Sequence, residues 1–97
     1  MASQTPIKNN LKSGVIIGVY PNPFIQDIQM QFNLFHTNPV MIQIVDMNGK
    51  MVFQKDMGTL NNGLHNEKIT VENIPAGVYQ LVIRSGNDII AKSIQKF

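Results

Sequence analysis

The stretch that decides the fold is Ile74–Phe97, which reads IPAGVYQLVIRSGNDIIAKSIQKF. Pro75 fixes its own φ in a turn that Gly77 closes, and apolar and polar side chains alternate after that turn. The apolar set is Tyr79, Leu81 and Ile83, and the polar set is Gln80 and Arg84. Because such alternation places one set on each face, this segment is predicted to be a half-buried strand.

A second strand is predicted directly after it. The dipeptide Gly86-Asn87 suits the two-residue loop of a β-hairpin. With this loop, three pairs of residues face one another: Ser85 with Asp88, Ile83 with Ile90 and Tyr79 with Ile94. The apolar residues of both strands then lie on one face, so the chain is expected to finish as a folded hairpin.

Composition indicates one small domain with a neutral body. The chain has 97 residues, 43% of them hydrophobic, which is enough for one core but not for a large internal cavity. Its formal charge of +2 comes from Lys8 and Lys12, because six basic and six acidic residues balance from Val15 onward. Nucleic-acid binding depends on clustered Lys and Arg that neutralise phosphates. We therefore expect no nucleic-acid partner.

The sequence also lacks several functional features. It contains no cysteine, which excludes disulfides, thiol nucleophiles and cysteine-based metal sites. No apolar run approaches the roughly 18 residues of a membrane-spanning helix, so no membrane span is expected. The first residues do not show the charged and then apolar pattern of an export signal.

Residues 1–14 are predicted to be a linker. They are polar and show neither a helical nor a strand period, and Pro6 and the pair Asn9-Asn10 are typical of loops. The opening residues Met1–Ser3 are also compatible with a cloning remnant. The folded domain is expected to span residues 15–97.

Two strands are predicted in the first half of the domain. Val15–Tyr20 is apolar and β-branched, and it ends at Pro21 and Pro23, which cannot donate backbone hydrogen bonds. This strand must therefore leave its sheet there or lie at an edge, and Phe24 would return to the core as an anchor. Asp27–Leu34 alternates cleanly between polar and apolar residues and is the clearest amphipathic strand.

Val40–Met57 is predicted to be another hairpin, with two possible registers. A two-residue loop at Asn48-Gly49 pairs Val45 with Val52 and Ile44 with Phe53. A type I turn opened by Asp46, with Gly49 as a left-handed bulge, pairs Ile44 with Val52 and Ile42 with Gln54. We favour the type I turn, because it requires Asp at its first position and Gly at its fourth. It leaves three apolar residues on the outer face: Val45, Met51 and Phe53.

The remaining segments complete an all-β pattern. Thr59–Leu64 is predicted to be a loop, and Lys68–Val71 a strand with Ile69 and Val71 inward. No helical period extends beyond about two turns, and turn residues recur about every 8 to 12 residues. The sequence therefore predicts an all-β sandwich of about seven antiparallel strands in two sheets.

The sequence gives no indication of a catalytic site. His36 and His65, the only two histidines, have no serine or carboxylate at a catalytic spacing, and we interpret both as surface residues. Asp46–Gly49 resembles part of a calcium loop, but its glycine comes too early and no glutamate follows at the twelfth position. The six methionines are spaced as filler of a strand core. We expect no catalytic residue, metal or cofactor, and hence no enzyme.

Most aromatic residues are interpreted as core or rim: Tyr20, Phe24, Phe32, Tyr79 and Phe97. Phe35 and Phe53 remain as candidates for an exposed ligand platform. Two separate rings give little support to a sugar-binding surface.

Several segments together resemble a known family. They are Val19–Phe24 (VYPNPF), Ile42–Val52 (IQIVDMNGKMV), Ile74–Leu81 (IPAGVYQL) and Lys92 in the final strand. Each is weak alone, since Pro-Asn-Pro and Asn-Gly turns are common. In this order and at this spacing, from about Gly18 to Phe97, the sequence is similar to the type A C-terminal sorting domain of the type IX secretion system.

The resemblance implies a secretion signal with an Ig-like β-sandwich fold. In Gram-negative bacteria such a domain follows an N-terminal cargo protein, which reaches the periplasm through an ordinary signal peptide. The outer-membrane translocon and shuttle proteins recognise the folded domain. A sortase-like cysteine protease then removes it and joins the cargo to an anionic lipopolysaccharide. The implied location is the periplasm in transit, and then the outer membrane, the cell surface or the medium.

The resemblance also transfers family positions to this sequence. They are Tyr20, Pro21, Asn22, Pro23, Phe24, Asp46, Gly49, Lys50, Pro75, Gly77, Tyr79, Lys92 and Phe97. The scissile bond is expected between Lys8 and Val15. The chain departs from the family in its weakly basic end, Gln95–Phe97, and in having no cargo attached, which suggests an excised fragment.

The physical properties of β-strands suggest how a receptor recognises such a signal. An edge strand offers unpaired backbone groups to a receptor strand, so the final strand with its carboxylate is the expected contact. Lys92 has three interpretations: a charge that protects the edge, a partner for a turn carboxylate such as Asp46, or a receptor contact. Most glycine and proline positions are expected to be fold determinants, since each occupies a turn.

Two other classes of function remain open. An Ig-like or fibronectin-like adhesion or glycan-binding module would have the same fold, and so would a structural spacer. Of the three, only a sorting domain is expected to carry a fused reporter outside the outer membrane.

Overall fold

The computed structural model describes residues 10–11 and 14–97. Within them the chain forms strands and no helix, so no helix is long and apolar enough to cross a membrane. The strands are β1 (Asn10–Leu11), β2 (Gly14–Tyr20), β3 (Asp27–Leu34), β4 (Asn38–Val45), β5 (Met51–Leu60), β6 (Gly63–Thr70), β7 (Gly77–Ser85) and β8 (Asp88–Lys96). Because β1 has only two residues, seven longer strands remain, and the predicted all-β class is confirmed.

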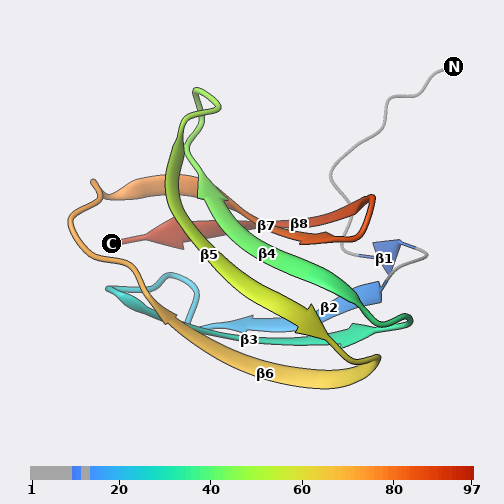
Figure 1. Cartoon of the computed structure of the whole chain (residues 1–97). Coiled ribbons are helices and arrows are strands. Elements are labelled where there is room, and N and C mark those ends of the chain that lie inside the picture. Colours follow the sequence, from blue (N-terminus) through green and yellow to red (C-terminus); the bar gives the residue numbers. More distant parts are fainter. Residues whose placement is uncertain (1–9, 12–13) are drawn as a thin grey trace, which may run out of the picture.

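The strands form two antiparallel sheets that pack face to face (Figure 1). One sheet has the order β1-β2-β3-β6, and the other has the order β5-β4-β7-β8. Sheets of three and four long strands are typical of an Ig-like sandwich. The inner faces supply the core, whose largest fully buried side chains are Phe24, Phe32, Ile28, Met30, Leu34, Ile42, Ile44, Leu81, Ile83, Ile90, Ile94 and Val40.

Two predicted segments are confirmed in detail. In the C-terminal hairpin, Ser85 pairs with Asp88, Ile83 with Ile90 and Tyr79 with Ile94. Strand β3 has the predicted bounds, and its alternate residues Ile28, Met30, Phe32 and Leu34 are all buried. Both predictions are correct because the alternation of polar and apolar residues and the turn residues indicate the same structure there.

The observed pairing of β4 and β5 differs from the register that the sequence analysis favours. Val45 pairs with Met51, but a bulge at Val52 then shifts the partner of Ile44 to Phe53. The expected pairs of Ile44 with Val52 and of Ile42 with Gln54 are therefore wrong. The extra residue in β5 turns Phe53 toward the core, where it packs half-buried instead of facing solvent. Phe53 is thus no exposed ligand platform.

Strand β6 is longer than predicted. It begins at Gly63, and β5 continues to Leu60, so the predicted loop at Thr59–Leu64 is present only as Asn61 and Asn62. Strand β6 is the edge of its sheet, so its inward-facing positions can carry polar residues such as His65 and Glu67. These residues conceal the alternation of polar and apolar side chains by which a strand is predicted. Ile69 and Val71 are buried as predicted.

Strand bounds also differ from the prediction near the N-terminus and at β4. Asn10–Leu11 pairs with Gly14 and Val15, so these residues of the predicted linker belong to a sheet. Residues 1–9 and 12–13, the rest of that linker, lie outside the described part. Strand β4 begins at Asn38 instead of Val40, because Asn38 and Pro39 already pair with β5.

Candidate recognition surface

One end of the sandwich collects most of the family positions that the sequence predicts. Strands β2, β4 and β8 finish there and β3, β5 and β7 begin there, although the β4–β5 turn stands apart from the β2–β3 turn (Figure 1). This motif end comprises Tyr20–Phe24, Asp46–Lys50, Pro75–Tyr79 and Gln95–Phe97. Of the predicted positions only Lys92 lies elsewhere, midway along β8.

Asn22–Phe24 is hydrogen-bonded to the last residues of the chain. The side-chain Oδ1 of Asn22 accepts a hydrogen bond from the backbone N–H of Gln95 at 2.9 Å. The N–H of Phe24 donates to the carbonyl of Gln95, and the N–H of Phe97 donates to the carbonyl of Phe24, both at 2.9 Å. The ring of Phe24 is fully buried, as predicted. These three hydrogen bonds are named the terminal clamp below.

The terminal clamp corrects the expectation that the last residues form an open edge. Strand β8 does lie at the edge of its sheet. In its antiparallel register with β7, Gln95 and Phe97 direct their backbone groups away from β7. The clamp satisfies three of those outward groups. A receptor strand can therefore pair with the end of β8 only by displacing Asn22–Phe24.

Asp46 organises the turn between β4 and β5. Its Oδ1 accepts hydrogen bonds from the backbone N–H groups of Asn48 and Lys50, both at 2.9 Å. Gly49 has a φ of 85°, which glycine adopts at little cost, and its N–H donates to the carbonyl of Asp46 at 3.0 Å. The turn chemistry is therefore the predicted one, and the Asp46 carboxylate is occupied within its own turn.

Tyr79 ties the beginning of β7 to the preceding turn. Its ring is buried, and its hydroxyl donates a hydrogen bond to the carbonyl oxygen of Pro75. A tyrosine at the start of this strand that bonds to the backbone a few residues upstream is the tyrosine corner of Ig-like sandwiches. Pro75, Gly77 and Tyr79 thus belong to one local structure that sets the direction of β7.

Lys92 is separate from the motif end. It pairs with Leu81, half-buried on the inner side of the edge strand β8. Within residues 14–97, Lys92 and Asp46 form no ion pair, and the Asp46 Oδ1 is held by its own turn. The remaining interpretations of Lys92 are a charge that protects the edge and a receptor contact.

His65 is not the ordinary surface residue that the sequence suggests. It stacks on Phe32 with ring centroids 5.5 Å apart, and its Nε2 lies 2.7 Å from the carbonyl oxygen of Asn61. A carbonyl oxygen only accepts, so this nitrogen carries the proton. His36 is exposed, as predicted. In the described part of the chain, no group of three or more His, Cys, Asp or Glu residues is placed to hold a metal ion.

A group of exposed apolar residues lies at or beside the motif end: Tyr20, Ile25, Met47, Met51, Val78 and Phe97. Of these, the sequence analysis placed only Met51 on an outer face. Met47 and Met51 are 71% and 48% exposed, so the interpretation of methionines as core filler is wrong for these two. The exposure of Val78 could have been predicted from the sequence, because Val78 precedes Tyr79 and so falls on the polar face of the alternating strand β7.

Comparison with known proteins adds one finding. A family model described as the secretion system C-terminal sorting domain matches residues 18–96. The matched range contains the Asp46 turn, the tyrosine corner and all of the terminal clamp except Phe97. No curated protein matches the chain significantly.

Proposed function

The chain belongs to the family of secretion system C-terminal sorting domains, and we propose that it is the signal that directs a fused N-terminal cargo through the type IX secretion system. Domains of this family serve export across the outer membrane to the cell surface or the medium. The proposed route begins in the periplasm, where the outer-membrane translocon and shuttle proteins bind the folded domain.

The convergence of the family positions on the motif end supports this proposal best. Three segments and the chain end lie at this end of the sandwich, although they are far apart in the sequence, and the segment after β2 is hydrogen-bonded to the chain end (Figure 1). The terminal clamp exists only when the residues after β2 have returned to β8. A receptor that binds this end would therefore distinguish folded cargo signals from unfolded ones.

We propose two roles for the family positions. The positions that maintain the fold are buried or occupy structured turns: Asn22, Pro23, Phe24, Asp46, Gly49, Pro75, Gly77 and Tyr79. The positions available to a receptor are exposed: Tyr20, Pro21, Lys50 and Phe97. Lys92 is half-buried and is assigned to protection of the β8 edge.

We also propose that a sortase-like cysteine protease removes the domain and that the cargo is then attached to the cell surface. The sorting domain would span residues 15–97, with the scissile bond between Lys8 and Val15. Within that segment Asn10–Leu11 pairs with β2. A protease would have to open this short pairing or cut outside it.

A reporter fusion tests the proposed function. The full chain is placed behind a signal peptide and a reporter protein and produced in a cell with an active type IX system. A sorting domain puts the reporter outside the outer membrane, whereas an adhesion or glycan-binding module leaves it in the periplasm. Moving the domain to the N-terminus of the reporter should abolish export, while a plain spacer would be indifferent to position.

A further inference from the structure

Each long edge strand of the sandwich carries a charged residue near its middle, on the side that faces the core. Apart from the two-residue β1, the edges of the two sheets in the described part of the chain are β5, β6 and β8. Each of these charged residues pairs with a buried core residue: Lys55 with Ile42, Glu67 with Met30 and Lys92 with Leu81. Paired residues of an antiparallel ladder share a face. The three charges therefore lie on the inner side of their sheets.

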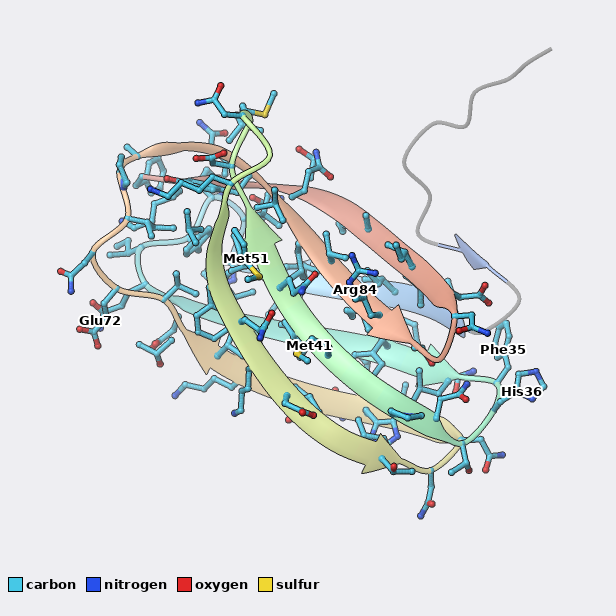
Figure 2. The ribbon with its side chains drawn as sticks, turned by 45° about the horizontal axis from the view of Figure 1, so that its top comes forward. Phe35, His36, Met41, Met51, Glu72 and Arg84 are labelled. Carbon is cyan, nitrogen blue, oxygen red and sulfur yellow. The ribbon has the colours of Figure 1, made fainter. Side chains whose placement is uncertain are left out.

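The central strands show the opposite arrangement. The charged residues of the described central strands are Asp27 in β3 and Arg84 in β7, and both are exposed. Asp27 pairs with the exposed Thr70, and Arg84 pairs with Met41, so both lie on outer faces. Figure 2 shows Arg84 and Met41 on the outer face of the sheet β5-β4-β7-β8. Inward charge is thus a property of the edge strands alone.

The same edges direct backbone hydrogen-bonding groups away from their sheets. The N–H of Val71 donates to the carbonyl of Gln26, which fixes the alternation of the ladder between β3 and β6. The backbone groups that point outward belong to alternate residues: Leu64, Asn66 and Lys68 in β6, and Ile89, Ala91 and Ser93 in β8. An edge with such groups is a template for a strand of another molecule unless something prevents the pairing.

An added strand would remove the inward charges from water. Lys55 is exposed, and Glu67 and Lys92 are half-buried, so each charged group reaches solvent past the edge of its sheet. A strand paired at that edge would extend the inner layer over the charged group, which is strongly unfavourable without a partner of opposite charge.

Symmetry adds a second penalty. The commonest association of identical chains is a two-fold dimer. Two-fold antiparallel pairing of the same edge from two copies brings the middle of one strand close to the middle of the other, where like charges oppose each other. We propose that Lys55, Glu67 and Lys92 keep the domain monomeric by preventing its three long edges from pairing with a second copy of the chain. This inference concerns the domain alone and does not depend on the proposed function.

A matched pair of lysine substitutions tests the inference. Lys55 and Lys68 are both exposed on edge strands, but Lys68 pairs with Gln29 and lies on the outer side. Lys55→Val and Lys68→Val therefore remove the same charge from opposite sides. In light scattering of the purified full chain, Lys55→Val should associate at a concentration at least about tenfold below that of the unsubstituted chain. Lys68→Val should shift that concentration by less than about twofold, as surface substitutions usually do.

Further variants separate charge from side-chain identity and locate the contact. Glu67→Val and Lys92→Val should associate as Lys55→Val does, since each removes the charge from another edge. Lys55→Glu keeps a charge at the same place and should remain as monomeric as the unsubstituted chain. Association of Glu67→Val should slow amide hydrogen exchange at Leu64 and Asn66, whose N–H groups point away from β3. Thermal unfolding establishes that the compared variants are folded.

Each outcome supports or overturns the inference. If Lys55→Val, Glu67→Val and Lys92→Val remain monomeric wherever Lys68→Val does, the inward charges do not protect the edges and the inference is wrong. It is also wrong if the unsubstituted chain dimerises through one of these edges, or if Lys55→Glu associates as readily as Lys55→Val. Export of the reporter fused to the unsubstituted chain decides the proposed function separately.

Discussion

The Oδ1 atom of Asn22 accepts a hydrogen bond from the backbone N–H of Gln95 at 2.9 Å, although the two residues are 73 positions apart in the sequence. This contact and the two backbone hydrogen bonds of Phe24 hold the end of β8 from the side that faces away from β7. The residues after the first long strand therefore fix the position of the last one.

Removal of the Asn22 acceptor should loosen the end of β8. Asn22→Ala is expected to lower the free energy of unfolding by about 1 kcal/mol, the usual net contribution of one hydrogen bond. Amide hydrogen exchange should become faster at Gln95 and Phe97. Asn22→Asp retains an acceptor oxygen and is the matched control. Unchanged exchange at Gln95 in Asn22→Ala would show that the side-chain contact does not restrain the strand.

The buried ring of Phe24 should be the largest single contributor among the motif residues. Phe24→Ala is expected to lower the free energy of unfolding by about 3–5 kcal/mol, because it removes a fully buried ring and leaves a cavity. Phe35 is 43% exposed, so Phe35→Ala should cost much less. Urea denaturation of the three chains measures the difference. Equal losses for the two variants would contradict the role of Phe24 as an anchor.

The hydroxyl of Tyr79 should stabilise the turn before β7. Tyr79→Phe keeps the buried ring and removes the bond to the carbonyl of Pro75, so the free energy of unfolding should fall by about 1 kcal/mol. Tyr20 is 49% exposed, and Tyr20→Phe serves as the control with little expected change. Thermal and urea unfolding provide the comparison. A Tyr79→Phe chain as stable as the parent would argue against a tyrosine corner.

The carboxylate of Asp46 should maintain the turn between β4 and β5. Asp46→Ala removes the acceptor for the N–H groups of Asn48 and Lys50, with an expected loss of about 1–2 kcal/mol. Asp46→Asn keeps a side-chain oxygen and should retain most of the stability. Urea denaturation and amide exchange at Asn48 test this, and similar behaviour of the two variants would refute it.

Local pattern predicted the segments whose neighbours are near in sequence. The Gly86-Asn87 turn, the alternation of β3 and the Asp46 turn all depend on residues within a few positions, and all are present. The register of β4 and β5 was wrong because the bulge at Val52 depends on core packing, which draws Phe53 inward.

Contacts between segments that are far apart in the chain could not be predicted from local sequence patterns. The Pro-Asn-Pro segment predicted a break after β2, but nothing local indicated that Asn22 and Phe24 bond to β8. Strand β6 is longer than the sequence predicts, because one of its inward-facing positions is occupied by a polar residue. His65 stacks on Phe32 at this edge of the sheet.

The location of a fused reporter tests the central claim most directly. The full chain is fused behind a periplasmic reporter in a strain with an intact type IX system and in the same strain without its translocon. The reporter should be accessible to added protease, or free in the medium, in the first strain and should stay in the periplasm of the second. A reporter retained in the periplasm of the intact strain, or exported without the translocon, would contradict the assignment of this domain as a secretion signal.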